Sequence, residues 1–326
     1  MKVELLKILR TSGEYVSGQY LCGHFGVSRT AIWKVIRQLK EEGYEIEAVK
    51  NKGYRILVTP DVMTAEELGS RLSTKWMGRN CVYRESVDST NNCARRLAEE
   101  GEEEGTLVVA EEQTGGKGRR GRSWTASKGR NIMMTLLLRP KIRPEHASRL
   151  TLLMAMAVAE GIRKTTGLSA GIKWPNDVVV DGKKVCGILT ELSTEVDYVN
   201  YVVIGAGINV NQEHFPDEIS EVAGSLCQKT GEKIKRAKLA AAVLEELERL
   251  YEIFLKTEDL SALYESYNQR CVNIGHEIRV LEPGKEYTGT TDGINARGEL
   301  VVRKADGTLT EVYAGEVSVR GLYGYV

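Results

Sequence analysis

Residues 115–124 read GGKGRRGRSW, a short segment in which glycines alternate with cationic side chains. Glycine lets backbone N–H groups approach an anion closely, and the interleaved Lys and Arg side chains supply positive charge and several hydrogen-bond donors. The segment has neither the Gly-Lys-Ser/Thr ending of a P-loop nor the GxGxxG order of a dinucleotide-binding turn. It therefore favours a phosphate-binding loop of another kind, with a solvated, flexible basic loop as the alternative.

Further motifs accompany this loop along the chain. They are Asp88-Ser89-Thr90-Asn91, Gln113, Lys173-Trp174-Pro175-Asn176-Asp177, Lys184 with Gly187-Ile188-Leu189 and Glu191, and Gly205-Ala206-Gly207-Ile208-Asn209-Val210-Asn211. Together with the loop, and in this order, they resemble the biotin protein ligases, in particular the bifunctional type that also represses a biotin operon. Each motif alone is weak, so the resemblance rests on their order and spacing, and it extends over essentially the whole chain.

The composition indicates an intracellular protein with several domains. Its 326 residues exceed the length at which one hydrophobic core usually stops growing. The N-terminus lacks the features of a signal peptide and no stretch reaches the length of an apolar membrane span, so we expect a cytoplasmic location and no membrane partner. The six cysteines form no CxxC pair and the four histidines are scattered, which argues against structural zinc and against a disulfide framework.

The first 60 residues predict a winged helix-turn-helix domain. They hold ten Lys/Arg and six Glu, a net charge of +4 (ten minus six) in a chain whose net charge is zero. Apolar spacing predicts three helices, the second from Ser17, a break at 23–27, and the third capped by Ser28. Two alternating runs within residues 44–57 flank a turn at 51–53 and predict a hairpin, the wing.

The third helix and the wing carry side chains suited to DNA. In a winged helix-turn-helix the third helix enters the major groove while the wing contacts phosphates. The candidate DNA-binding residues are Ser28, Arg29, Thr30, Trp33, Lys34, Arg37, Lys50, Lys52 and Arg55. One module of charge +4 binds weakly at physiological salt, so we expect a dimer on two half-sites of operator DNA. The alternative is a helical protein-interaction module with a solvated cationic face.

A second domain is predicted from Pro60 and the capping-box pattern Thr64-Ala-Glu-Glu67 onward. Hydrophobic patterns predict strands at 106–111, 131–138, 178–180 and 201–208, and helices at 91–100, 147–165 and 236–267. From about Cys271, short alternating strands follow, with turns predicted at Pro283-Gly284, Asp292-Gly293, Arg297-Gly298 and Asp306-Gly307.

These patterns predict an α+β multidomain fold. The expected domains are a winged helix-turn-helix at 1–60, a catalytic domain that binds biotin and ATP at 64–270, and a C-terminal domain at 271–326. The resemblance implies that the central domain is the mixed α/β domain of biotin/lipoate ligases and that the last is an SH3-like β-barrel.

The resemblance also implies an ATP-dependent ligase. In the family's reaction the biotin carboxylate attacks the α-phosphate of MgATP, which gives biotinyl-5′-AMP and releases pyrophosphate. The amine of a lysine of a biotin carboxyl carrier protein then attacks this mixed anhydride, takes the biotin and releases AMP. Because a carboxylate and a polyphosphate repel one another, fixed cations must offset the repulsion and orient the pair. The catalytic candidates carried over from the family motifs are Arg119, Lys184, Asp177 and Lys117.

The same motif matches imply the binding residues. For biotin they are Ser89, Thr90, Asn91, Gln113, Gly116, Lys117, Arg119, Arg120, Gly121, Lys184, Gly187, Gly205 and Gly207. For ATP they are Arg119, Arg120, Arg122, Trp124, Asn176, Lys184, Asn209 and Arg320, with Trp124 stacking on adenine. Asp177 is expected to accept a proton from the incoming lysine or to hold Mg²⁺. Structural roles are the alternatives: an N-cap at Ser89 and Thr90, a Trp-Pro-Asn turn, and an exposed Arg320.

Lys117 departs from the family pattern, because many members have arginine there and lysine lacks the planar fork of donors. In the bifunctional members the retained adenylate favours dimerisation, so the resemblance implies a homodimer favoured by biotinyl-5′-AMP. Three alternatives stay open: a lipoate protein ligase, a non-catalytic biotin-sensing regulator, and a ligase whose N-terminal module no longer binds DNA.

Overall fold

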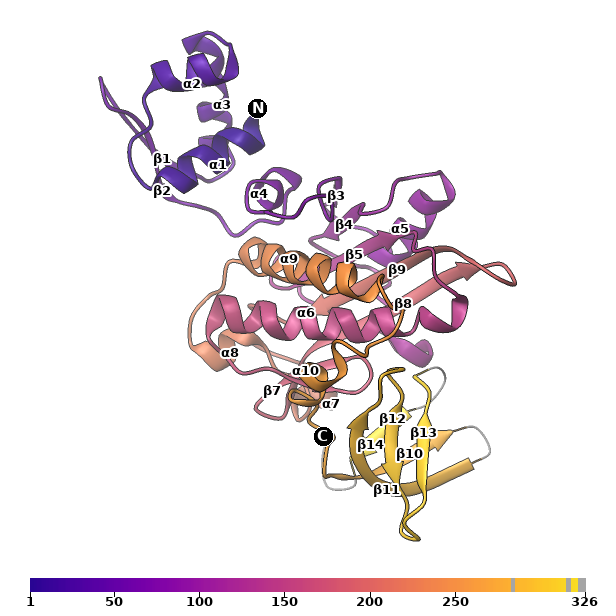
Figure 1. The fold of residues 1–326 in the computed structure, drawn as a ribbon. Helices are drawn as coiled ribbons and strands as arrows, with labels where there is room; N and C mark the ends of the chain where they lie inside the picture. The colour runs from indigo at the N-terminus through magenta and orange to yellow at the C-terminus, as the bar shows by residue number, and fades with distance from the viewer. Residues whose placement is uncertain (283–284, 315–317, 322–326) are drawn as a thin grey trace.

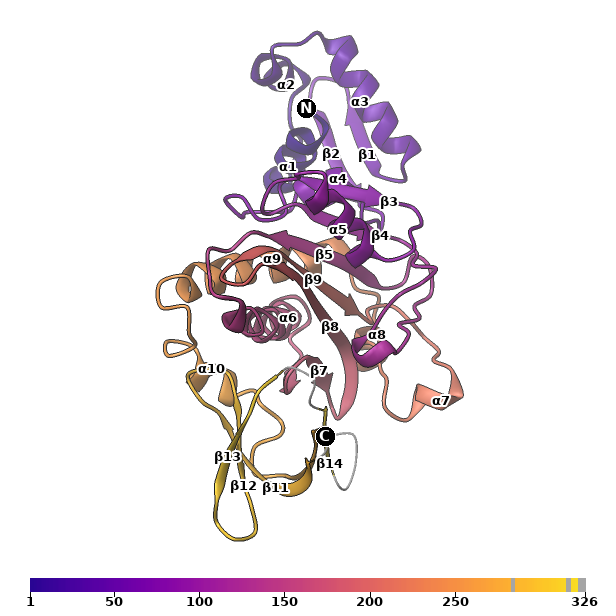
Figure 2. The same cartoon turned by 90° about the vertical axis from the view of Figure 1, so that its right-hand side faces the viewer.

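The computed structural model describes residues 1–282, 285–314 and 318–321 of the chain. A helical domain with one hairpin, a central domain on a seven-stranded sheet and a C-terminal five-stranded sheet follow one another along the chain (Figures 1 and 2). This order confirms the predicted α+β multidomain fold class. Within the described part, no helix has the length and apolar character needed to cross a membrane.

The N-terminal domain has the elements predicted for a winged helix-turn-helix. They are α1 (Lys2–Ser12), α2 (Gly18–Phe25), α3 (Arg29–Glu41), β1 (Glu45–Val49) and β2 (Gly53–Val58). The hydroxyls of Ser17 and Ser28 cap α2 and α3 by accepting backbone N–H bonds. The break between these helices is shorter than predicted, because α2 continues through Gly23 to Phe25 and is capped by Gly26, whose φ is +63°.

The central domain is built on a mixed sheet with the strand order β3-β4-β5-β9-β8-β7-β6, in which only β3 and β4 pair in parallel. The strands are β3 (Cys81–Arg84), β4 (Leu107–Ala110), β5 (Ile132–Leu138), β6 (Gly171–Lys173), β7 (Asp177–Val180), β8 (Lys183–Thr194) and β9 (Val199–Ile208). The four predicted strands correspond to β4, β5, β7 and β9. The strands β3, β6 and the twelve-residue β8 were not predicted from the sequence.

Helices cover both faces of this sheet (Figure 2). Helix α5 (Thr90–Glu99) packs on one face, and α6 (Arg149–Thr166) and α9 (Arg236–Phe254) pack together on the other. The remaining helices are α4 (Ala65–Gly69), α7 (Asp217–Ser220), α8 (Leu226–Thr230) and α10 (Tyr264–Asn268). The predicted single helix over 236–267 is wrong, because α9 ends at Phe254 and Glu258 adopts a left-handed φ of +58° before α10 begins.

The predicted capping box at Thr64 and the possible cap at Ser89 are each only partly present in the structure. The hydroxyl of Thr64 accepts the Glu67 N–H at 3.3 Å, but the Glu67 side chain turns toward the N-terminal domain, so the capping box is only half formed. Ser89 occupies the N-cap position of α5 without a side-chain cap bond. The start of α5 is held instead by Gln113, which belongs to the site described below.

The C-terminal part is an antiparallel sheet with the order β13-β12-β11-β10-β14. Its strands are β10 (Glu277–Glu282), β11 (Lys285–Ile294), β12 (Leu300–Arg303), β13 (Leu309–Val312) and β14 (Ser318–Gly321). No ladder joins β13 to β14 among the described residues, so closure into an SH3-like barrel stays a prediction. The turn predicted at Asp292-Gly293 is wrong, because both residues lie inside β11 at a shift of register. The predicted turn at Pro283-Gly284 lies outside the described residues.

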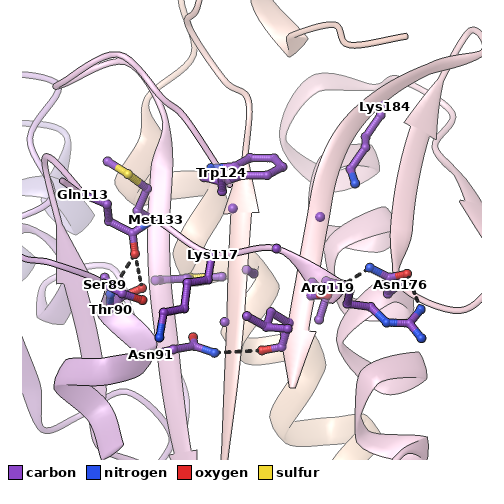
Figure 3. Close-up of a pocket in the computed structure, with 18 residues that line it drawn as sticks. Ser89, Thr90, Asn91, Gln113, Lys117, Arg119, Trp124, Met133, Asn176 and Lys184 are labelled. Atoms are coloured by element: carbon purple, nitrogen blue, oxygen red, sulfur yellow. Dashed lines mark hydrogen bonds between the residues drawn. The ribbon is translucent and has the colours of Figure 1, made fainter. Parts of the chain in front are cut away.

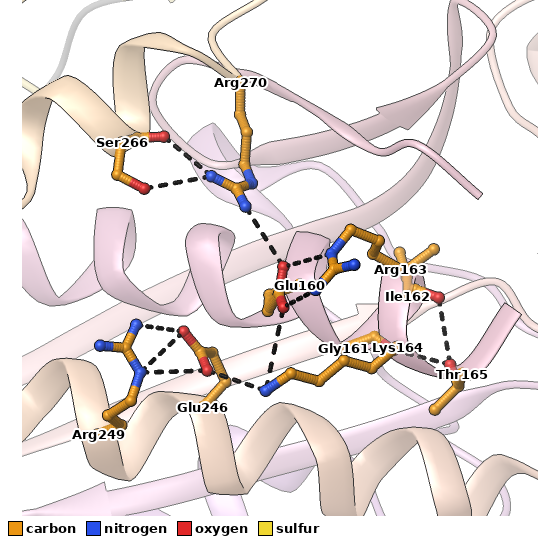
Figure 4. A network of polar contacts seen from close by, with 10 residues as sticks. All are labelled: Glu160, Gly161, Ile162, Arg163, Lys164, Thr165, Glu246, Arg249, Ser266 and Arg270. Carbon is orange, nitrogen blue, oxygen red and sulfur yellow. Dashed lines mark hydrogen bonds and ion pairs between the residues drawn. The ribbon is translucent and has the colours of Figure 1, made fainter. Parts of the chain in front are cut away.

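A network of charges joins α6 and α9 to the segment that leads into the C-terminal sheet (Figure 4). The Glu160 carboxylate accepts bonds from Arg163 at 2.6 and 2.9 Å and from Arg270 at 3.3 Å. Lys164 of the same helix reaches Glu246 of α9 at 3.2 Å. These bonds hold α6, α9 and the segment at Arg270 together.

Candidate active site and nucleic-acid interface

A cavity opens over the strands β5, β9 and β8 and the N-terminus of α5 (Figure 3). It is lined by Ser89, Thr90, Asn91, Gln113, Lys117, Gly118, Arg119, Trp124, Met133, Met134, Asn176, Lys184, Gly187, Ile188, Leu189, Gly205, Ala206 and Gly207. Every motif noted in the sequence contributes to this lining. The fold thus brings together residues from six separate segments of the central domain, 89–91, 113–124, 133–134, 176, 184–189 and 205–207.

A polar shelf forms where α5 begins. The backbone N–H and the hydroxyl of Thr90 both donate to Gln113 Oε1, at 2.7 and 2.9 Å. The Asn91 amide donates to the Leu189 carbonyl at 3.2 Å (Figure 3) and also to Glu191 Oε2 at 2.7 Å. The buried Thr135 hydroxyl lies 2.8 Å from Thr90 Oγ1 and 2.7 Å from Asn91 Oδ1. These contacts fix the orientation of the shelf in advance of any ligand.

Glycines are required on the floor of the cavity because side chains lie directly above them. A Cβ at Gly205 would collide with the Asn91 amide. A Cβ at Gly207 would lie 2.6–2.8 Å from the Trp124 indole, and one at Gly187 would lie 3.0 Å from the same ring. The indole therefore rests on the bare backbone of β8 and β9.

The basic loop is a tight hairpin that closes against this floor. Trp124 N–H donates to the Gly116 carbonyl at 2.9 Å, and Gly118 N–H donates to the Arg122 carbonyl at 2.7 Å. A Cβ at Gly116 would collide with the Trp124 carbonyl, so glycine is required by the close approach of the two strands of the loop. Arg120, at the tip, adopts a left-handed φ of +57°.

Arg119 joins three parts of the chain. Its Nη1 donates to Asn176 Oδ1 at 3.0 Å, and its Nη2 donates to the carbonyl of Ala314 in the C-terminal part at 3.1 Å. Burial lowers the pKa of the Arg119 guanidinium below its ordinary value, while the Asp177 carboxylate acts in the opposite direction. The ordinary value is so high that the group remains a cation inside the site.

Lys184 is the second cation at this end of the cavity. Its Nζ lies 2.6 Å from Asp177 Oδ1 on the neighbouring strand β7 and 5.8 Å from the centroid of the Trp124 ring. Its side chain is 26% exposed, so it reaches the cavity while staying close to the carboxylate. The third cation, Lys117, donates to Asn92 Oδ1 at 3.0 Å at the rim.

Some of the candidate residues lie outside the cavity lining. Arg120, Gly121 and Arg122 are exposed on the hairpin tip, and Gly116 shapes the loop. Asn209 is buried and its amide donates to the Gly224 carbonyl at 3.1 Å, so it holds the 212–224 segment. Asp177 does not line the cavity itself, and its carboxylate lies 2.6 Å from Lys184, which does. The Arg320 side chain lies outside the described residues.

The structure also adds lining residues that were not predicted: Gly118, Met133, Met134, Ile188, Leu189 and Ala206. Three of them, Met133, Met134 and Ala206, lie on β5 and β9, which are buried on both faces, so an unbroken apolar run gives no sign of which side chains face a ligand. Within the described part of the chain, no group of three His, Cys, Asp or Glu side chains is placed to hold a metal ion.

The predicted DNA-binding surface lies on the N-terminal domain. Ser28, Arg29, Thr30, Trp33, Lys34, Arg37, Lys50 and Lys52 are exposed. Trp33, 50% exposed, carries the Arg37 guanidinium 5.1 Å from its ring centroid. Arg55 differs from the rest, because it pairs with Glu47 at 3.2 Å and stacks over Tyr15.

Comparison with known proteins identifies the chain. Its residues 83–209 match the model of the biotin/lipoate A/B protein ligase family. The bifunctional ligase/repressor BirA of Bacillus subtilis is 39% identical over 324 residues, which cover 98% of each chain. The chain belongs to the biotin protein ligase family.

Other members of the biotin protein ligase family agree with this assignment. The bifunctional ligase/repressor BirA of Escherichia coli is 30% identical over 96% of this chain and 95% of its own. The biotin protein ligase of Aquifex aeolicus, solved in complex with biotin and ATP, superposes with a TM-score of 0.66 at 30% identity over 74% of this chain and 99% of that one.

The two flanking parts of this biotin protein ligase match models of their own. Residues 3–55 match an HTH domain, and residues 274–320 match the biotin protein ligase C-terminal domain. A lipoate ligase would share the central family model, whereas the relatives named above, which align over nearly the whole chain, are biotin ligases.

Proposed function

We propose that the protein ligates biotin to a lysine of a biotin carboxyl carrier protein through biotinyl-5′-AMP and also acts as a biotin-responsive DNA-binding repressor. The observation that carries the proposal is a single cavity in which a polar shelf at Thr90 and Gln113 faces the cations Arg119 and Lys184. The neutral ring system of biotin suits the polar shelf. The biotin carboxylate and the α-phosphate of ATP, which are both negatively charged, suit the two cations.

Biotin lies between the shelf and the apolar wall in this proposal. Ser89, Thr90 and Gln113 face its ureido group, while Met133, Met134 and Ala206 pack on its fused rings and aliphatic chain. The two hydrogen bonds from Thr90 to Gln113 hold these side chains in place, so the binding of biotin has to order little of the shelf.

Adenylation requires that Lys184 exchange partners. In the structure the Lys184 ammonium is neutralised by the Asp177 carboxylate at 2.6 Å. An incoming biotin carboxylate and α-phosphate offer negative charge to Lys184 and Arg119, which stabilise the charge that develops in the transition state. Trp124 covers this end of the cavity, where adenine would stack.

Asp177 then serves the second step. Once Lys184 turns toward the adenylate, the Asp177 carboxylate can take a proton from the lysine ammonium of the carrier protein, whose amine must be neutral to attack. Magnesium enters with ATP as part of that substrate. The short contact between Asp177 and Lys184 favours the proton-acceptor role over direct binding of Mg²⁺.

Regulation completes the proposal. The adenylate-loaded protein either modifies its carrier protein or forms a homodimer that binds operator DNA through α3 and the wing. The exposed cations of the N-terminal domain support DNA binding. A cytoplasmic location and the division into residues 1–60, 64–270 and 271–326 belong to the same proposal.

Biotin-dependent exchange of pyrophosphate into ATP tests the first step. We expect exchange with biotin and little with lipoate or octanoate. Exchange with lipoate alone would assign the wrong ligand, and no exchange in folded protein that binds biotin would favour the non-catalytic sensor. Transfer to a carrier protein, and DNA binding with and without biotin and MgATP, then separate a bifunctional protein from a ligase that no longer binds DNA.

A further inference from the structure

The DNA-binding domain and the ligase domain have separate hydrophobic cores. The core of the first is formed by α1, α2, α3 and the hairpin, and that of the second by the central sheet, α4, α6 and α9. The two domains meet where α1 lies beside α4, as both views of the molecule show (Figures 1 and 2). Ion pairs and hydrogen bonds cross the contact between α1 and α4.

Glu67 of α4 is at the centre of this contact. Its carboxylate accepts bonds from Arg10 of α1 at 2.8 Å, from the Tyr44 hydroxyl at 2.7 Å and from Arg71 at 2.6 Å. The Glu67 side chain is only 1% exposed. One carboxylate therefore holds two residues of the DNA-binding domain and one of the ligase domain.

Residues next to Glu67 also help to hold α1 against α4. Arg10 also donates to the Ser70 hydroxyl, which in turn donates to the Glu67 carbonyl at 2.8 Å. Gly69 lets α1 approach closely, since a Cβ there would lie 3.3 Å from Val3 Cγ1. Burial and the neighbouring carboxylate raise the pKa of Tyr44 far above its ordinary value, so its hydroxyl stays a neutral donor.

A buried charged cluster acts differently from an apolar contact. Apolar surfaces can slide with little change in energy, whereas a carboxylate with three directed donors has few alternative arrangements that satisfy every partner. Such clusters contribute more to a single defined geometry than to net stability. The orientation of α1 relative to α4 is therefore strongly specified at this point.

We propose that Glu67 is a positioning residue that fixes the orientation of the DNA-binding domain on the ligase domain, and so sets the half-site spacing that a dimer reads. The proposal rests on the DNA-binding function proposed above. The helix α3, which carries the candidate base contacts, is rigidly joined to Tyr44 through the core of its domain, so a rotation about the α1–α4 contact displaces both recognition helices of a dimer.

The test compares Glu67→Gln with Glu66→Gln in the full-length protein. Glu66 precedes Glu67 on the same helix, and its side chain is 39% exposed. Its carboxylate lies 3.7 Å from Lys2 Nζ, which is a long and exposed ion pair, so Glu66→Gln removes the same charge without removing a buried bond and is the matched control. The probe is a duplex enriched from a random library by the wild-type protein with biotin and MgATP, together with derivatives in which one base pair is inserted or removed between the half-sites. Hydrogen exchange of residues 2–12 and 59–69 gives a readout that needs no DNA.

For Glu67→Gln we expect about tenfold weaker binding of the enriched duplex, reduced discrimination between spacings and faster exchange in both segments, because the link between the domains is loosened. Biotin-dependent pyrophosphate exchange should stay within about twofold, and Glu66→Gln should resemble wild type. If Glu67→Gln does not fold, Tyr44→Phe removes one donor without a change of charge and should show the same effects more weakly.

Two results overturn the proposal. One is a folded Glu67→Gln protein that binds DNA with wild-type affinity and spacing preference. This result would refute the positioning role of Glu67 and leave the proposed DNA-binding function intact. The other is an equal loss of adenylation and DNA binding, which makes Glu67 a general structural residue. A wild-type protein that enriches no sequence instead refutes the DNA-binding function itself, and the positioning role with it.

Discussion

Lys184 Nζ lies 2.6 Å from Asp177 Oδ1, so the cation expected to meet the anionic substrates is paired with the carboxylate expected to take a proton. The pair joins adjacent strands, and the backbones of these residues are fixed by the β7–β8 ladder. One ion pair thus contains the residue expected to act in adenylation, Lys184, and the residue expected to act in the transfer of biotin, Asp177.

Lys184→Gln should lower the rate of biotin-dependent pyrophosphate exchange by about 100-fold or more, since it removes a fixed charge from the transition state. Lys183→Gln is the matched control, because Lys183 is adjacent on β8 but donates to the Ser220 carbonyl outside the cavity. An equal loss in both variants would show that charge at the start of β8 matters only for folding.

Asp177→Asn should slow transfer of biotin to the carrier protein by roughly 100-fold, because the amide cannot accept the proton of the attacking amine. Adenylation should be affected much less. Single-turnover transfer from preformed biotinyl-5′-AMP measures the second step separately. Equal losses in the two steps would assign Asp177 to the placement of Lys184 alone.

Gly207→Ala should raise the KM for ATP with a smaller effect on the KM for biotin. The added Cβ would lie 2.6 Å from Trp124 Cε2, so the indole must leave the floor that it covers. Gly23→Ala, on α2 with open space around it, should leave both constants unchanged and stabilise the protein slightly. Unchanged kinetics in Gly207→Ala would separate Trp124 from the ATP site.

Trp33→Ala should weaken specific DNA binding by about tenfold or more while leaving the thermal midpoint nearly unchanged. The side chain is half exposed and removing it also frees Arg37 from the stacked position. Gln38→Ala tests an exposed neighbour on the same helix. A protein-interaction module in place of a DNA reader would show no difference between the two variants.

Stability should fall at acidic pH through the Glu160 network. The hydrogen bond from Arg163 lowers the pKa of Glu160 below its ordinary value of 4.5, so the folded state binds fewer protons than the unfolded state. The stabilisation is therefore present above pH 4.5 and is lost as pH falls through the lower folded-state pKa. Glu160→Gln should cost about 1–2 kcal/mol at pH 7 and flatten this acid dependence in urea titrations.

Residues that carry a chemical signature could be predicted from the sequence, and residues placed by packing could not. Glycines beside cations, the Thr90–Gln113 pair and Lys184 all line one cavity. The Arg119–Ala314 bond joins positions 195 residues apart, which no local pattern encodes. The strand β8 was missed because its buried and exposed residues do not alternate regularly. The turn predicted at Asp292-Gly293 failed because the same dipeptide forms a bulge within a strand.

One strand, β8, supplies Lys184, the floor at Gly187 and the wall at Ile188 and Leu189, and its pairing with β9 is unbroken from Cys186 to Ser193. Side chains alternate between the two faces of a strand, so one inserted or deleted residue would reverse every position beyond it. Between Cys186 and Ser193, substitutions can therefore be tolerated, whereas an insertion or a deletion would turn the lining residues away from the cavity. Insertions can be accommodated only beyond Ser193, where the register already shifts at the hairpin that leads into β9.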